Sequence, residues 1–158
     1  METMESQDQI DDLIRRLSMI PSRIAHAVET MPGAEKRRAL SADEWSASQI
    51  LAHLRASNDI VAYRLYAILA RDTPPLPAYD ERRWAKVAGY EDSDFESSLQ
   101  IFTLCRAELV AVLQKIDIAD WQPFGIHEEK GVLSLFEVGT SLVEHEKEHC
   151  QQLENIYT

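Results

Sequence analysis

Glycine and cysteine are scarce in this sequence, and each shortage excludes a class of protein. Among 158 residues there are five glycines and two cysteines. So few glycines, with no sustained alternation of polar and apolar residues between turns, do not fit a fold of many short strands. Cys105 and Cys150 are expected to be free thiols, because a chain of this length buries an adequate core without disulfides.

Positive charge is also scarce. Lysine and arginine number 16 against 27 acidic residues, so the formal net charge is -11, and the acidic residues are spread along the chain. The densest basic cluster is the short run Lys36-Arg37-Arg38. A protein that binds nucleic acid through the phosphate backbone needs a basic face. Nucleic acid is therefore not an expected partner.

Long hydrophobic runs are missing as well. No apolar stretch approaches the length needed to span a membrane, and the N-terminal segment METMESQDQIDDLI is acidic and polar, unlike a signal peptide. No membrane association is expected, and a cytoplasmic location is the simplest interpretation. The length suits a single domain over residues 1–158.

Helix signals dominate what is present. In a capping box, a serine and the glutamate or glutamine three residues later satisfy each other's backbone N–H groups at a helix start. The pattern occurs at four places: Ser6 with Gln9, Ser41 with Glu44, Ser93 with Glu96, and Ser134 with Glu137. These starts, with apolar residues at three- and four-residue spacing, predict helices over about 6–31, 42–71, 94–116 and 135 to the C-terminus.

Four such helices predict an all-α four-helix bundle. Pro21 lies inside the first predicted helix and is expected to kink it. The connection over residues 72–92, DTPPLPAYDERRWAKVAGYED, contains three prolines and is too long for a simple turn. Such a segment can cross from one end of the bundle to the other. The second and third helices are therefore expected to run parallel.

A pattern typical of metal sites, H-E-x-x-H, occurs near the end of the chain as His145-Glu146-Lys147-Glu148-His149. The apolar stripe of the fourth helix passes through both histidines, with Leu142 before them and Leu153 after them. Both histidines are therefore expected to face the core. Residues four apart on a helix lie about 5–6 Å apart, which lets two imidazoles hold one ion.

His53 is the candidate for a third ligand. It lies on the flank of the apolar stripe of the second helix, at a depth that matches the histidine pair. A lone histidine in such a place is more often a hydrogen-bonded structural residue. Two inward imidazoles without a metal would each need a buried partner, so the three histidines together favour a metal site. His26 is expected at the surface, and His127, in a loop, is expected to be solvated.

The H-E-x-x-H pattern usually indicates a zinc protease, in which the glutamate is the general base and a third ligand lies well downstream. Only nine residues follow His149, and Glu154 is their sole carboxylate. No sheet edge that could bind an extended peptide is predicted. The protease interpretation is therefore weak. Glu146 is then either a proton acceptor or a solvated residue.

The motifs resemble those of the DinB-like superfamily. The resemblance covers nearly the whole chain and rests on Trp45-Ser46, His53-Leu54 and the final His145-x-x-x-His149-x-x-Gln152. It implies an up-down-down-up bundle, a homodimer, and a metal site of His53, His145 and His149 in which Gln152 orients a ligand. Many members have Arg-Gly before this glutamine, where the present chain has Cys150-Gln151.

The same resemblance carries an expectation about function. Family members include transferases and isomerases that use low-molecular-weight thiols, and proteins described as metal-dependent hydrolases. Three neutral imidazoles leave positions open on an ion, which is typical of a catalytic site. The resemblance thus implies a divalent zinc, nickel, iron or manganese ion and a small-molecule substrate, acted on by thiol transfer or hydrolysis. The alternative is a noncatalytic metal-binding or stress-associated binding protein.

Overall fold

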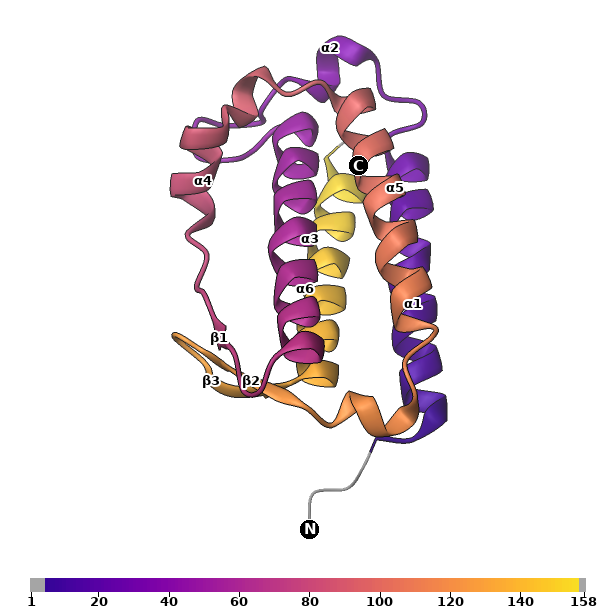
Figure 1. Ribbon diagram of the computed structural model, residues 1–158. Coiled ribbons are helices and arrows are strands. Elements are labelled where there is room, and N and C mark those ends of the chain that lie inside the picture. Colours follow the sequence, from indigo (N-terminus) through magenta and orange to yellow (C-terminus); the bar gives the residue numbers. More distant parts are fainter. Residues whose placement is uncertain (1–4, 157–158) are drawn as a thin grey trace.

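Four long helices form the body of the molecule in the computed structural model, which describes residues 5–156 (Figure 1). The predicted all-α four-helix bundle is confirmed. The long helices are α1 Gln7–Ala27, α3 Ala47–Ala70, α5 Phe95–Leu113 and α6 Leu135–Asn155. The connections contain the short helices α2 Gly33–Lys36 and α4 Glu81–Ala88, and the 3₁₀ turns η1 Tyr90–Asp92 and η2 Ile118–Trp121.

Two of the four predicted helix starts are as expected. Ser6 and Ser134 each accept a hydrogen bond from the backbone N–H three residues later, and the side chains of Gln9 and Glu137 complete the two boxes. Pro21 lies within α1 and is buried. The prediction that the last helix continues to the C-terminus extends to residues 157 and 158, which lie outside the described part of the chain.

The other two predicted cap residues are wrong, although the third helix begins close to the expected residue 94. The second long helix begins beyond Ser41, because Ser46 forms the capping box with Gln49. At the third start the cap is Asp94, one residue beyond Ser93. In both places a competing cap residue lies closer to the segment that packs into the bundle.

Among the described residues, no helix combines the length and the apolar character that a membrane span requires.

The connection between α3 and α5 returns the chain along the length of the bundle. Figure 1 shows α3 and α5 both ending at the end of the molecule where α6 begins. These two helices therefore run in the same direction, opposite to α1 and α6. The crossover carries α4 along one side of the bundle, next to α3.

A small sheet joins the two long connections, although no strand was predicted. It contains β1 Pro75–Leu76, β2 Phe124–His127 and β3 Gly131–Ser134, in the order β1-β2-β3. The first pair is parallel and the second is antiparallel. A Cβ at Gly125 would lie 2.8 Å from Cγ of Leu76, so the close approach of β1 to β2 requires glycine here.

The bundle core has two apolar clusters, one toward each end. From the first helix and its end, Ile10, Leu13, Ile14 and Leu17 belong to the cluster near the sheet, and Ile20, Ile24 and Val28 belong to the other. The buried side chain of Cys150 packs in the second cluster, and both cysteines are free. Apolar burial of this kind supplies the main driving force for folding.

A buried ionic network links all four long helices. Arg106 on α5 is 1% exposed, and Glu146 on α6 and Asn58 on α3 are 0% and 1% exposed. The guanidinium donates to both carboxylate oxygens of Glu146, twice to Oδ1 of Asn58 at 2.8 and 3.0 Å, and to the carbonyl oxygen of Leu17 on α1 at 3.1 Å. All five N–H groups of Arg106 are therefore used.

Candidate metal centre

Helices α3 and α6 bring His53, His145 and His149 together. One ring nitrogen from each histidine lies within 4.8 Å of the others. The Nε2 atoms of His53 and His145 are 2.9 Å apart, and the ring centroids of His145 and His149 are 4.7 Å apart. The three residues that the sequence singled out therefore form one cluster, with nitrogens converging from two helices.

The two histidines of α6 occupy the edge of its buried face. The fully buried ridge of this helix passes instead through Leu142, Glu146 and Cys150. His145 and His149 lie beside that ridge and are half-buried, so the expectation that they point into the core is wrong in detail. His53, by contrast, is 0% exposed. The cluster thus sits at the wall of the bundle, where a small molecule can reach it.

Burial keeps His53 and His145 neutral. It lowers the pKa of His53 to about 3, with further lowering by the neighbouring His149 and His145. Burial likewise lowers the pKa of His145 to about 4, helped by His149 and by Lys130. At neutral pH both rings are therefore uncharged, which is the form of imidazole that binds a metal.

Hydrogen bonds to Nδ1 fix the orientation of two of the three rings, those of His53 and His149. The hydroxyl of Tyr79 lies 3.2 Å from Nδ1 of His53 and 3.2 Å from the hydroxyl of Tyr90. Oε1 of Gln152 lies 3.0 Å from Nδ1 of His149. The amide oxygen can only accept, so this Nδ1 carries the hydrogen and donates it, which leaves Nε2 of His149 with a lone pair.

Glu146, the glutamate of the H-E-x-x-H pattern, pairs with Arg106 and makes no contact with the histidine cluster that the structure records. Both expectations for Glu146, proton acceptor or solvated residue, are wrong, because this carboxylate is buried against Arg106. The carboxylate beside the cluster is Glu81, at the start of α4. Its Oε2 lies 3.7 Å from Nε2 of His53, and its side chain is 52% exposed. Neither Glu81 nor Tyr79 was identified from the sequence.

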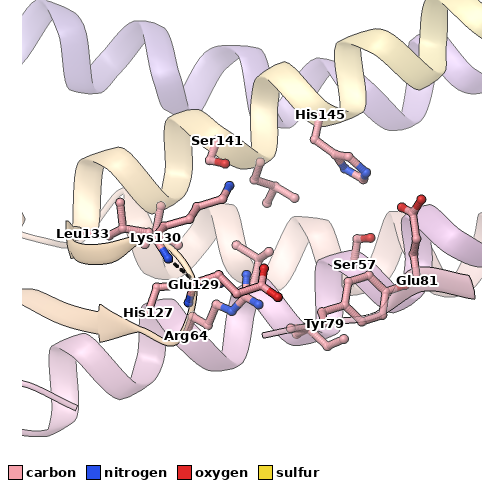
Figure 2. A pocket seen from close by; sticks show the side chains of 14 residues that line it. Ser57, Arg64, Tyr79, Glu81, His127, Glu129, Lys130, Leu133, Ser141 and His145 are labelled. Atoms are coloured by element: carbon pink, nitrogen blue, oxygen red, sulfur yellow. Dashed lines mark hydrogen bonds between the residues drawn. The ribbon is translucent and has the colours of Figure 1, made fainter. Parts of the chain in front are cut away.

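A pocket of about 230 Å³ opens next to His145. Figure 2 shows Glu81 and Tyr79 at the end nearer His145, and Arg64, His127 and Lys130 at the other end. The lining also contains apolar side chains, which include Ile60, Val61 and Leu142. The volume is slightly below the usual range for small-molecule sites, about 300–1,000 Å³, so the pocket suits a small ligand and not a folded partner.

His127 is buried, and not solvated as expected. It is the last residue of β2, is 5% exposed and lines the pocket. Its Nδ1 accepts the backbone N–H groups of Glu129 and Lys130 at 3.2 and 3.3 Å. His26 lies at the surface as expected, with Nδ1 3.4 Å from a carboxylate oxygen of Glu29.

Comparison with known proteins points to one family. The family model described as the DinB superfamily matches residues 16–153. The protein named "Putative metal-dependent hydrolase YfiT" of Bacillus subtilis is 25% identical over 111 residues, which cover 70% of this chain and 62% of that relative. OB0413 of Oceanobacillus iheyensis has the same description and is 18% identical over 92% of this chain and 84% of its own length.

Two solved structures share the fold. The structure of YfiT from Bacillus subtilis, described as an unusual four-helix bundle topology, superposes with a TM-score of 0.89. It is 22% identical and covers 99% of this chain and 89% of its own. A mycothiol-dependent maleylpyruvate isomerase superposes with a TM-score of 0.74 at 12% identity, over 91% of this chain and 60% of the isomerase.

Proposed function

Because the chain belongs to the DinB superfamily, we propose that it is a metal-dependent enzyme that acts on a small molecule by hydrolysis or thiol transfer. His53, His145 and His149 would hold the ion, which is zinc, nickel, iron or manganese. The observation that carries the proposal is the convergence of three imidazole nitrogens within 4.8 Å beside a pocket. The description of relatives as metal-dependent hydrolases and the thiol dependence of the isomerase support it.

The residues present fit a divalent ion. Three imidazoles are a common ligand set for such ions, and the low pKa values of His53 and His145 keep their nitrogens unprotonated at neutral pH. When bound, the ion would supply Lewis-acid activation of a water or a thiol. Tyr79 and Gln152 would orient His53 and His149 toward it.

The remaining side chains of the site have separable roles. Glu81 is placed to accept a proton from a nucleophile at the histidines, the role that the sequence pattern suggested for Glu146. The apolar wall of the pocket, which includes Ile60 and Leu142, excludes water from part of the substrate. A noncatalytic metal-binding protein would need neither feature.

Elemental analysis tests the metal site. Protein purified without added metal should contain about one ion per chain, as expected for a single cluster of ligands. His53→Ala and His149→Ala should lose the ion, whereas His26→Ala, at an exposed histidine, should retain it. Wild-type protein without metal, or either cluster variant with a full complement, would contradict the proposal.

Activity separates the two reaction classes. The metal-loaded protein is tested with a low-molecular-weight thiol and the electrophile monochlorobimane, and separately with simple esters. A rate that depends on both the metal and the thiol supports transfer, and a metal-dependent rate without thiol supports hydrolysis. The noncatalytic alternative is supported if both rates are absent from protein that binds metal.

The resemblance also suggests an assembly and a location. We propose a homodimer in the cytoplasm. Light scattering coupled to size-exclusion chromatography measures the first, and a monomeric mass would contradict it. Fractionation of the source cells measures the second.

A further inference from the structure

The end of the pocket away from the histidines is lined by hydrogen-bond donors. Arg64 extends from α3, and His127 and Lys130 belong to the β2–β3 hairpin (Figure 2). Arg64 donates two N–H groups to the carbonyl oxygen of Pro77, which holds it against the crossover. Three donors from two separate elements therefore meet at one end of a cavity whose lining also contains apolar side chains.

Lys130 points into this cavity without an acidic partner. Within residues 5–156, no carboxylate lies within ion-pair distance of its ammonium group. Figure 2 shows its side chain extending from the hairpin toward α6, and its charge acts on the pKa of His145. A cation so placed is available to a ligand anion.

His127 supplies a donor whose direction is fixed. Its Nδ1 accepts two backbone N–H groups, so this nitrogen carries no hydrogen and the neutral ring bears its hydrogen on Nε2. Burial lowers the pKa of His127, and the nearby Arg64 and Lys130 lower it further, so the ring stays neutral. The Nε2–H group forms no hydrogen bond with the described residues.

Two acidic residues of the hairpin turn, Glu128 and Glu129, act against these donors. Glu129 follows His127 in the hairpin turn and also lines the pocket. Glu128 does not line the pocket and accepts the backbone N–H of Ala78 at 2.7 Å, but its charge still acts on Arg64 and His127. Glu81 lies near the histidines, at the other end. The hairpin end thus has two cations and a neutral donor near two carboxylates, of which only that of Glu129 lines the pocket, and Lys130 forms no ion pair with either of them.

We infer that the hairpin end of the pocket binds a carboxylate group of the substrate through Lys130, Arg64 and His127, while the reacting group lies at the histidines. The inference rests on the proposed function and narrows its substrate to a small organic acid. The apolar stretch that contains Ile60, Val61 and Leu142 would contact the part of the molecule between its two ends.

Binding of paired thiols to cobalt-substituted protein tests the inference. Mercaptoalkanoic acids of increasing chain length are compared with mercaptoalkanols of equal length, and binding is followed by the thiolate-to-cobalt charge-transfer band. At the best length the acid should bind about tenfold more tightly than the alcohol, as expected for a charge-assisted hydrogen bond. Lys130→Met should remove most of this preference and leave alcohol binding unchanged.

Two further variants make the test specific. Glu129→Gln should increase the preference for the acid, because it removes an opposing charge. Lys115→Met, at an exposed lysine outside the pocket, is the matched control and should change nothing. Equal binding of acid and alcohol by the wild type, or equal weakening of both by Lys130→Met, would overturn the inference and leave the metal site intact. If no thiol perturbs the cobalt spectrum, the thiol-dependent function fails and the inference fails with it.

Discussion

Replacement of Glu146 by glutamine should destabilise the protein strongly. Glu146→Gln keeps the size of the side chain but leaves the guanidinium of Arg106, which is 1% exposed, without a counterion. Removing one partner of a buried ion pair typically costs about 3–5 kcal/mol, a large part of the total stability of a domain. With a urea dependence of about 2 kcal/mol per molar, the unfolding midpoint should fall by about 2 M.

Replacing Arg106 and replacing Glu146 should have different effects on the pH dependence of stability. An arginine cannot release its proton, whereas a buried carboxyl can take one up, and burial raises the pKa of Glu146. In Arg106→Met the carboxyl is protonated more readily in the folded than in the unfolded state. Compared with the wild type at the same pH, this variant should therefore be less destabilised at about pH 5 than at neutral pH, because the contribution of a carboxyl with a raised folded-state pKa falls as the pH rises toward that pKa.

Urea unfolding followed by circular dichroism measures both effects. Glu144→Gln is the control, since Glu144 lies on the same helix and pairs with Arg16 at the surface; its midpoint should hardly change. The double variant Arg106→Met with Glu146→Leu should be less destabilised than the sum of the single changes. A midpoint for Glu146→Gln close to that of Glu144→Gln would refute the reasoning that the pair is desolvated.

Two other predictions concern the histidines. Tyr79→Phe and Gln152→Leu each remove the hydrogen-bond partner of one histidine Nδ1 and should weaken metal binding about tenfold by isothermal titration calorimetry, with unfolding unchanged. Metal-free protein should lose stability as the pH falls below 6.5, because the unfolded chain protonates a histidine that the fold keeps neutral at a pKa of about 3. At pH 5 the contribution of His53 to this loss is about 2 kcal/mol. Urea unfolding of His53→Phe should therefore show a free energy of unfolding that falls less between pH 6.5 and pH 5 than that of the wild type. An equal pH dependence in the two proteins would contradict the assignment.

Helical periodicity was enough to predict the bundle and to select the three histidines. Each long helix repeats apolar residues on one face, and the spacing of His145 and His149 places both on one side of α6. The third member, His53, was found because its depth along α3 matched that pair. Periodicity fixes which residues share a face, but it does not give the width of the face that neighbouring helices cover.

That limitation explains the error at Glu146. α6 packs against both α1 and α3, so its covered face is wider than a single stripe of leucines suggests. A charged residue within the covered face carries no apolar signal. Its partner Arg106 is 40 positions away in sequence, on another helix, and no local pattern connects the two.

The crossover was predicted, but helix α4 within it and the small sheet were missed, for different reasons. Helix α4 has a sequence signal, since Asp80 accepts a hydrogen bond at its start and Gly89 ends it with φ of 64°. It was obscured by the prolines just before it. The strands are only two to four residues long, too short for alternation to be visible, and their pairing depends on contacts between segments about fifty residues apart.

The elements that line the pocket differ in how well they tolerate substitutions. The histidines lie on packed helices, where a substitution disturbs the core, whereas Tyr79 and Glu81 lie in the crossover and His127 and Lys130 lie in the β2–β3 hairpin. On the proposed assignment of the histidines as metal ligands, a bundle of this kind would be able to change these two connections, and with them its substrate, while it keeps the ligands. Transfer of residues 124–134 into another member of the superfamily should then carry the proposed preference for an acid with the hairpin.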